Sequence, residues 1–217
     1  MQMTLRWYGS KYDTVTLKQI RQIPGVTGVI STLYGTAPGE VWKTEDILAL
    51  KKEIEDAGLK LIGIESVNIH DAIKVGTPDR DQYIDNYITT LERLGQADIH
   101  MVCYNFMPVF DWLRTDMHHV LFDGSNALSY SRDDFDKVDP KHLHLPGWDE
   151  SYSPDELQDL LEKYKHISHE QLFANLVYFL NQIMPICDQY GISMAIHPDD
   201  PPWDVFGLPR IIPNEED

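Results

Sequence analysis

The chain has 217 residues, of which 42% are hydrophobic and 24% charged, a composition typical of a globular protein with one sizeable core. Its 35 acidic and 18 basic residues give a net charge of −17, which repels nucleic acid and anionic membranes and argues against both as partners. The two cysteines have no metal-binding spacing, and the sequence shows no signal peptide or membrane span, so we expect a protein of the reducing cytoplasm.

Apolar runs alternate with amphipathic segments along the first half of the chain. Strands are predicted over residues 5–9, 26–33, 59–64 and 99–103. A short helix is expected over residues 17–23. Thr44 is predicted to cap a second helix that Gly58 ends, and Thr77 to open a third that Gly95 ends.

Residues 107–167 interrupt this rhythm, because the loop between a strand and its helix usually has only a few residues. A helix is predicted to start at the capping box Ser153–Glu156. We expect the insertion to be a lid or a subunit contact, and Trp112, Arg114 and Trp148 favour the lid. His118, His119, His142 and His144 are interpreted as surface residues.

After the insertion the pattern resumes. Ser168 and Gln171 predict a second capping box and a helix that Gly191 ends, followed by a strand over residues 192–196. Such alternation indicates a parallel sheet, which a doubly wound fold and a barrel both satisfy. No Gly-x-Gly-x-x-Gly turn supports a dinucleotide fold.

Polar residues at many strand ends favour a (β/α)8 TIM barrel, in which such ends carry the chemistry. These strand-end residues are Trp7, His70, Asn105 and His197. A closed barrel takes about 250 residues, whereas five strands and the insertion are predicted here. Residues 1–217 are therefore expected to be an incomplete barrel, with about five strand–helix units, from a longer protein.

The most informative strand end is Ala195-Ile196-His197-Pro198-Asp199-Asp200-Pro201-Pro202. Proline cannot donate to a sheet, so the strand stops here and the histidine is held at its end. Taken alone, a histidine at this position is better explained as a capped strand end whose ring bonds a neighbouring carbonyl group, and the rest of the chain favours a functional role.

Several motifs together resemble the mannonate dehydratase family of xylose-isomerase-like barrels, in order and over essentially the whole chain. They are Arg6-Trp7-Tyr8-Gly9, Glu65-Ser66 with Ile69-His70, residues 102–109, Asp111-Trp112 with residues 114–116, and residues 197–202 with 207–210. The resemblance implies dehydration of D-mannonate to 2-keto-3-deoxy-D-gluconate in hexuronate breakdown. It also implies a divalent metal, Mn²⁺ or alternatively Fe²⁺, with His197 as a ligand and the other family ligands beyond this chain. Leu113, where the family often has Thr, and Asn68, where Pro is common, depart from the pattern.

Further roles follow from the position of each residue and the resemblance. His70 and Tyr104 are expected to transfer protons, although His70 could simply close its turn and Tyr104 could be core. Trp7 is expected to wall the substrate pocket. Asn105 would contact a substrate hydroxyl, or alternatively its own backbone.

Two more residues have a predicted role and at least one alternative role. Arg114 would hold the substrate carboxylate, or be a solvated charge. Asp199 would contact substrate, orient His197, or cap the turn. The alternative functions are a sugar or sugar-phosphate isomerase on the same barrel, or a non-catalytic fragment. We expect a homodimer that binds a small sugar acid.

Overall fold

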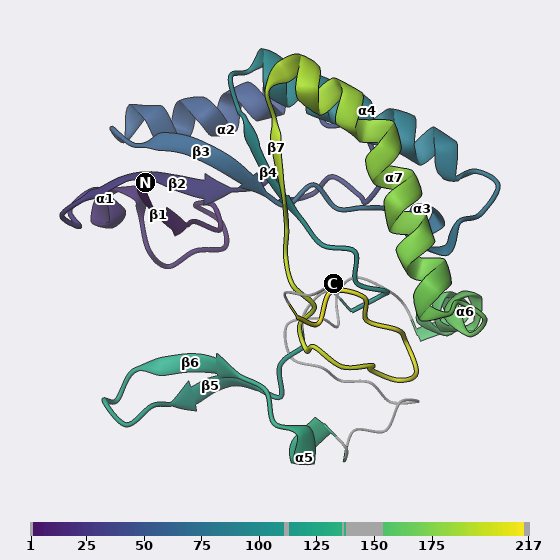
Figure 1. Ribbon diagram of the computed structural model, residues 1–217. Helices are drawn as coiled ribbons and strands as arrows, with labels where there is room; N and C mark the ends of the chain where they lie inside the picture. Colours follow the sequence, from purple (N-terminus) through teal and green to yellow (C-terminus); the bar gives the residue numbers. More distant parts are fainter. Residues whose placement is uncertain (1, 111–112, 136, 138–153, 215–217) are drawn as a thin grey trace. The chain divides into compact units, whose positions relative to one another are not determined.

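The computed structural model describes residues 2–110, 113–135, 137 and 154–214 (Figure 1). The chain forms two compact units. Unit 1 comprises Met1–Phe106 with Ala174–His197, and unit 2 comprises Met107–Phe173 with Pro198–Asp217.

Unit 1 is built on a five-stranded parallel sheet. Its strands are β1 (Met3–Arg6), β2 (Val26–Ser31), β3 (Lys60–Glu65), β4 (Met101–Tyr104) and β7 (Ser193–Ile196). They lie side by side in the order β1-β2-β3-β4-β7, and every neighbouring pair is parallel. A doubly wound sheet reverses its strand order at a switch point, and this sheet does not. The winding is that of part of a barrel, as the strand-end residues predict.

The helices of unit 1 are α1 (Leu17–Ile20), α2 (Thr44–Asp56), α3 (Asp71–Val75), α4 (Arg80–Gln96) and α7 (His169–Tyr190), which enters unit 1 at Ala174. Within unit 1, α2, α4 and α7 lie on one side of the sheet (Figure 1). The sheet and these helices bury apolar side chains between them, including Ile64, Val102, Leu91, Leu94, Phe179 and Ile183.

The opposite face of the sheet is less covered within unit 1. Glu65, Cys103 and Ala195 pair in register across β3, β4 and β7. Because side chains alternate along a strand, these three share a face, and all three are half-buried. Ile64, Val102 and Met194 form the adjacent row and point toward the helices.

Several of the predicted helix ends are wrong. The helix α1 ends at Ile20 rather than at residue 23, and α4 begins at Arg80, with Asp79 rather than Thr77 before it. Thr44 is the first helical residue of α2, whereas the capping position is Lys43, which makes no side-chain capping bond. Gly95 lies inside α4, which continues to Gln96, and the turn that follows places Asp98 at φ 60°. A Cβ at Gly95 would lie 2.5 Å from the ring of Tyr190, so this glycine is explained by close packing of α4 on α7.

Other predicted ends are confirmed. Gly58 and Gly191 follow α2 and α7 with φ of 76° and 63°, a conformation that favours glycine. The Ser168 hydroxyl accepts a hydrogen bond from the Gln171 backbone N–H at 3.2 Å, as a helix cap should. The short helix α3 was not predicted.

Unit 2 contains the antiparallel hairpin of β5 (Asp116–Val120) and β6 (Asn126–Ser129), followed by α5 (Arg132–Phe135) and α6 (Pro154–Tyr164). The helix predicted near residue 153 is therefore α6. His118 and His119 lie on β5 and are exposed, as predicted. Trp112, Trp148, His142 and His144 lie outside the described residues, and the lid or subunit contact stays a prediction. Within the described ranges, no helix is long and apolar enough to cross a membrane.

Candidate functional site

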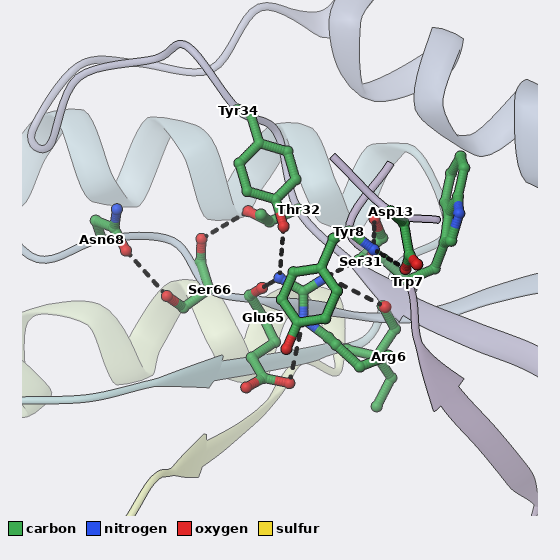
Figure 2. Close-up of polar contacts among 11 residues, drawn as sticks. Arg6, Trp7, Tyr8, Asp13, Ser31, Thr32, Tyr34, Glu65, Ser66 and Asn68 are labelled. Atoms are coloured by element: carbon green, nitrogen blue, oxygen red, sulfur yellow. Dashed lines mark hydrogen bonds and ion pairs between the residues drawn. The ribbon is translucent and has the colours of Figure 1, made fainter. Parts of the chain in front are cut away.

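Arg6, the last residue of β1, connects the carboxyl ends of three strands (Figure 2). Its Nη1 donates to the carbonyl oxygen of Trp7 at 2.7 Å and, more weakly, to that of Ile30 at 3.5 Å. Its Nη2 donates to the Glu65 carbonyl oxygen at 2.6 Å and to the Tyr34 hydroxyl at 3.2 Å. Hydrogen bonds from a cation to carbonyl oxygens are stronger than neutral ones, so Arg6 fixes the ends of β1, β2 and β3 relative to one another.

Glu65, the last residue of β3, carries the opposite charge. Its Oε2 lies 3.6 Å from Arg6 Nε, and the side chain of Glu65 is 39% exposed against 21% for Arg6. Its register partner Cys103 has a raised thiol pKa, first because of burial and second because of the Glu65 charge. Cys103 is therefore a protonated thiol at neutral pH.

Tyrosines from the loops after β1 and β2 contact Arg6. The Arg6 guanidinium lies 4.6 Å from the centre of the Tyr8 ring, and Tyr34 contacts the ring of Tyr12 at 4.8 Å. Burial of its hydroxyl raises the pKa of Tyr34, and Arg6 offsets part of that effect. The phenol is thus neutral at physiological pH.

Asp13 gives the loop after β1 its shape. One carboxylate oxygen accepts from the Tyr8 backbone N–H at 3.0 Å and the other from the Val15 N–H at 2.8 Å. The loop that carries Tyr8 and Tyr12 is thereby closed on itself. The strand-end cluster consists of Arg6, Glu65, Tyr8 and Tyr34.

The predicted metal ligand His197 directly follows β7 and is exposed. Its backbone N–H donates to the Tyr104 carbonyl oxygen at 2.7 Å, which continues the ladder between β7 and β4. By alternation its side chain shares the face of Ala195 and Cys103. Asn105, which directly follows β4, is half-buried and lies on that same face by the same alternation.

His70 caps α3. Its Nδ1 accepts from the Ala72 backbone N–H at 3.1 Å, and its ring stacks on Tyr83 with 3.6 Å between centres. It also lines a small pocket of about 390 Å³, open solvent included, together with Ser66, Asn68 and Thr36. The structure thus shows the turn-closing alternative, and a proton-transfer role for His70 remains a prediction.

Tyr104 lies on the helix-covered face, opposite to Glu65 and Cys103. Its side chain is 5% exposed and contacts the Phe179 ring of α7, and burial raises its pKa to about 12. A phenol in this place belongs to the core between β4 and α7. Its position argues against the proton-transfer role predicted for it.

Trp7 is 2% exposed, and Figure 2 shows its indole turned away from the Arg6–Glu65 pair. Its Nε1 is buried without a hydrogen-bond partner in the described part of the chain. Trp7 contributes its backbone carbonyl to the site, where it accepts from Arg6 and from the Ser31 hydroxyl at 2.7 Å. Its ring is buried on the side of the strand opposite to Arg6, which argues against the pocket-wall role predicted for it.

Two predicted substrate contacts lie in unit 2. Arg114 forms an ion pair with Asp200, with Nη2 2.8 Å from Oδ2, so a carboxylate of the chain itself engages its guanidinium. Asp199 is 6% exposed, and its Oδ2 accepts from the backbone N–H groups of Ile211 and Ile212 at 2.7 Å each. These bonds tie Asp199 to a segment twelve residues further along the chain, which is a structural role, and substrate contact and the orientation of His197 remain predictions.

The described residues do not make a complete metal site. Within residues 2–110, 113–135, 137 and 154–214, no three histidine, cysteine or carboxylate side chains lie close enough to hold an ion. His197 alone would leave most of the coordination sphere to other groups. The implied metal therefore finds at most part of its ligand set among the described residues.

Arg6 and Glu65 were not predicted as site residues, although both stand in the motifs that carry the family resemblance. A usable signal existed, because each is a charged residue that ends an apolar strand, and the two charges are opposite. Strands that neighbour one another along the chain usually lie close in space, so such residues are candidates for an ion pair at the sheet edge.

Comparisons with known proteins give a consistent result. The family model described as D-mannonate dehydratase (UxuA) matches residues 1–217. The chain is 59% identical to the mannonate dehydratase of Brachyspira hyodysenteriae and 51% identical to that of Thermotoga maritima, in each case over the whole of this chain. It covers 64% and 63% of those two proteins.

The fold is also similar to a crystal structure of mannonate dehydratase from Streptococcus suis serotype 2. The TM-score is 0.88 at 46% sequence identity, over all of this chain and 58% of that one. The prediction of an α/β fold that forms part of a barrel is thereby confirmed. The chain spans about three-fifths of the length of the relatives it matches.

Proposed function

The chain belongs to the D-mannonate dehydratase family, and from that premise we propose that the protein of which it is part dehydrates D-mannonate to 2-keto-3-deoxy-D-gluconate in hexuronate breakdown. The observation that carries the proposal is the alignment of the whole chain, with 51–59% of its residues identical, to proteins named for this reaction. The sequential parallel sheet, with polar side chains at its strand ends, supports it.

The reaction places definite demands on the site. A proton must leave the carbon beside a carboxylate, the enediolate that results must be stabilised, and the departing hydroxyl must be protonated. A divalent cation, when bound, would stabilise the enediolate. We propose Mn²⁺ as that cation, with Fe²⁺ as the alternative and His197 as a ligand. The described residues offer no cluster of three ligands, so they do not supply a complete ligand set for this cation.

The residues of this chain have more limited roles in the proposal. His197 and Asn105 follow neighbouring strands and share the half-buried face of the sheet, where a substrate would meet them. Arg6 holds the strand ends in place. Arg114 is paired with Asp200, so it could bind a substrate carboxylate only after releasing the carboxylate of Asp200.

The test uses a full-length protein that contains these 217 residues, purified and loaded with Mn²⁺. It is offered D-mannonate and, in parallel, a panel of aldoses and sugar phosphates. We expect formation of a 2-keto-3-deoxy acid from mannonate only. Turnover confined to the aldoses or sugar phosphates would instead support the isomerase alternative and overturn the proposal. Size-exclusion chromatography of the same sample tests the expected homodimer.

A further inference from the structure

We propose that Glu65 binds hydroxyl groups on the carbon chain of the substrate, and that Arg6 is the positioning residue that holds Glu65 for this task. The inference rests on the proposed function, since it names a subsite of that same site. It is carried by the strand-end cluster, which the geometry of unit 1 places at the carboxyl ends of β1, β2 and β3 (Figure 2).

Glu65 has hydrogen-bonding capacity that the described part of its chain does not use. Its carboxylate is 39% exposed, and Arg6 Nε, at 3.6 Å, is its ion-pair partner. Within the described ranges, no side-chain or backbone donor forms a hydrogen bond to its two oxygens. An ionised carboxylate offers about four acceptor positions. Glu65 can therefore accept hydrogen bonds from an incoming ligand without breaking existing ones.

Arg6 is in the opposite situation. Its two terminal nitrogens already donate to the Trp7, Ile30 and Glu65 carbonyl oxygens and to the Tyr34 hydroxyl. Such a guanidinium would have to give up bonds to the strand ends in order to bind a substrate. Arg6 acts instead on the Glu65 carboxylate beside it, which it holds at the carboxyl end of β3.

The surroundings select the class of ligand. Tyr8 and Tyr34, which are 50% and 42% exposed, contact Arg6, and Tyr12, which is 57% exposed, contacts the ring of Tyr34. Aromatic faces for C–H groups and a carboxylate for hydroxyl groups suit a polyhydroxylated chain. A substrate carboxylate would be repelled by Glu65, so the hydroxylated end of a sugar acid is the part that fits here.

The experiment measures binding of D-mannonate by calorimetry to the full-length protein and to its Glu65→Gln variant. The substitution keeps the shape of the side chain and removes its charge. A hydrogen bond to a charged group is worth enough that its loss weakens affinity about tenfold or more. We expect that loss for D-mannonate, a matching rise in KM, and a much smaller loss for the four-carbon acid L-erythronate, which has the C2 and C3 configuration of D-mannonate but lacks its distal hydroxyls.

The matched control is Asp56→Asn, which also removes one negative charge. Asp56 lies on α2 in an exposed pair with Lys52, with 64% and 73% of their side chains accessible. This control separates the local effect at Glu65 from a change in net charge, and it should leave both affinities unchanged.

The positioning role of Arg6 is tested with Arg6→Lys, alone and combined with Glu65→Gln. If Arg6 acts through Glu65, the double variant should bind mannonate no more weakly than Glu65→Gln alone. A purely structural Arg6 would weaken binding additively with Glu65→Gln, and that result would overturn its positioning role.

The inference and the proposed function fail in different ways. If the wild-type protein turns over mannonate but Glu65→Gln binds it with wild-type affinity, the subsite is wrong and the function stands. If the wild-type protein does not dehydrate mannonate, the function is wrong. The calorimetric comparison of the two acids then still decides whether Glu65 binds hydroxyl groups.

Discussion

At the scale of single residues, the position of a side chain relative to the sheet separates reactive candidates from packed ones. His197 and Glu65 lie on the half-buried face, whereas Tyr104 and Trp7 are turned into the core. Asp199 and Arg114 are engaged within unit 2 by two backbone N–H groups and by Asp200, respectively. Residue type alone did not distinguish these situations.

We predict that His197→Ala, made in the full-length protein, lowers the metal content without unfolding it. The side chain is exposed, so its removal should change the free energy of unfolding by only about 1 kcal/mol. Elemental analysis and thermal denaturation of the purified variant measure the two quantities. His118→Ala, which alters an exposed histidine on β5, is the control. Full metal occupancy in His197→Ala would contradict the ligand role.

At the scale of elements, unit 1 depends on how α4 and α7 pack on each other and on β4. Tyr104 of β4 and Cys187 of α7 are 5% and 1% exposed, and burial raises their pKa values to about 12 and about 11. Gly95 of α4 lies against Tyr190 of α7. Each contact gives a measurable consequence.

The first consequence is a loss of stability at alkaline pH. Both groups have a folded-state pKa above the unfolded value, so their neutral forms favour the folded state. The stability linked to Cys187 should be fully present below about pH 9 and lost by about pH 11, and that linked to Tyr104 between about pH 10 and pH 12. Thermal denaturation from pH 8 to pH 11 should show a shallower decline in Cys187→Ala than in the wild type. Parallel curves would show that the thiol does not contribute.

The second consequence concerns Gly95→Ala. Alanine normally favours a helix interior by about 1 kcal/mol over glycine, but here its methyl group would lie 2.5 Å from the ring of Tyr190. We expect overpacking to dominate and to destabilise the protein by about 1–3 kcal/mol. Adding Tyr190→Ala should remove most of this penalty in a double-mutant cycle measured by urea unfolding. A stabilised Gly95→Ala variant would show that the helices separate without cost.

At the scale of the whole molecule, the edges of the sheet are the feature that bears most on association with other chains. In the described residues β1 and β7 are the outer strands, and each is hydrogen-bonded to one neighbour. Exposed edges invite pairing with other chains. The face that carries Glu65, Cys103 and Ala195 is also only half-buried within unit 1.

We therefore predict that residues 1–217, expressed alone, associate with one another and lack dehydratase activity. The net charge of −17 opposes aggregation but supplies no missing metal ligand. The measurements are light scattering and 2-keto-3-deoxy-gluconate formation with added Mn²⁺. Turnover by a monodisperse sample would show that these residues hold a complete site.

The sequence by itself determined the order and type of most elements in unit 1, and the family. Helices that end at Gly58 and Gly191 and apolar strands that follow them reflect local propensities, which need no tertiary contact to be recognised. The strand-end motifs carried the family resemblance, because their residues stand in the sequence whatever the fold does with them.

Only the tertiary structure decided which strand-end side chains meet. Successive residues point to opposite faces, so Tyr104 and Asn105, or Arg6 and Trp7, could exchange roles until the helix-covered face was known. The register that aligns Glu65 with Cys103, and the approach of Arg6 from β1 to Glu65 on β3, join residues far apart in the chain. Likewise Gly95 predicted a helix end, and only the ring of Tyr190 against it explains why glycine is there.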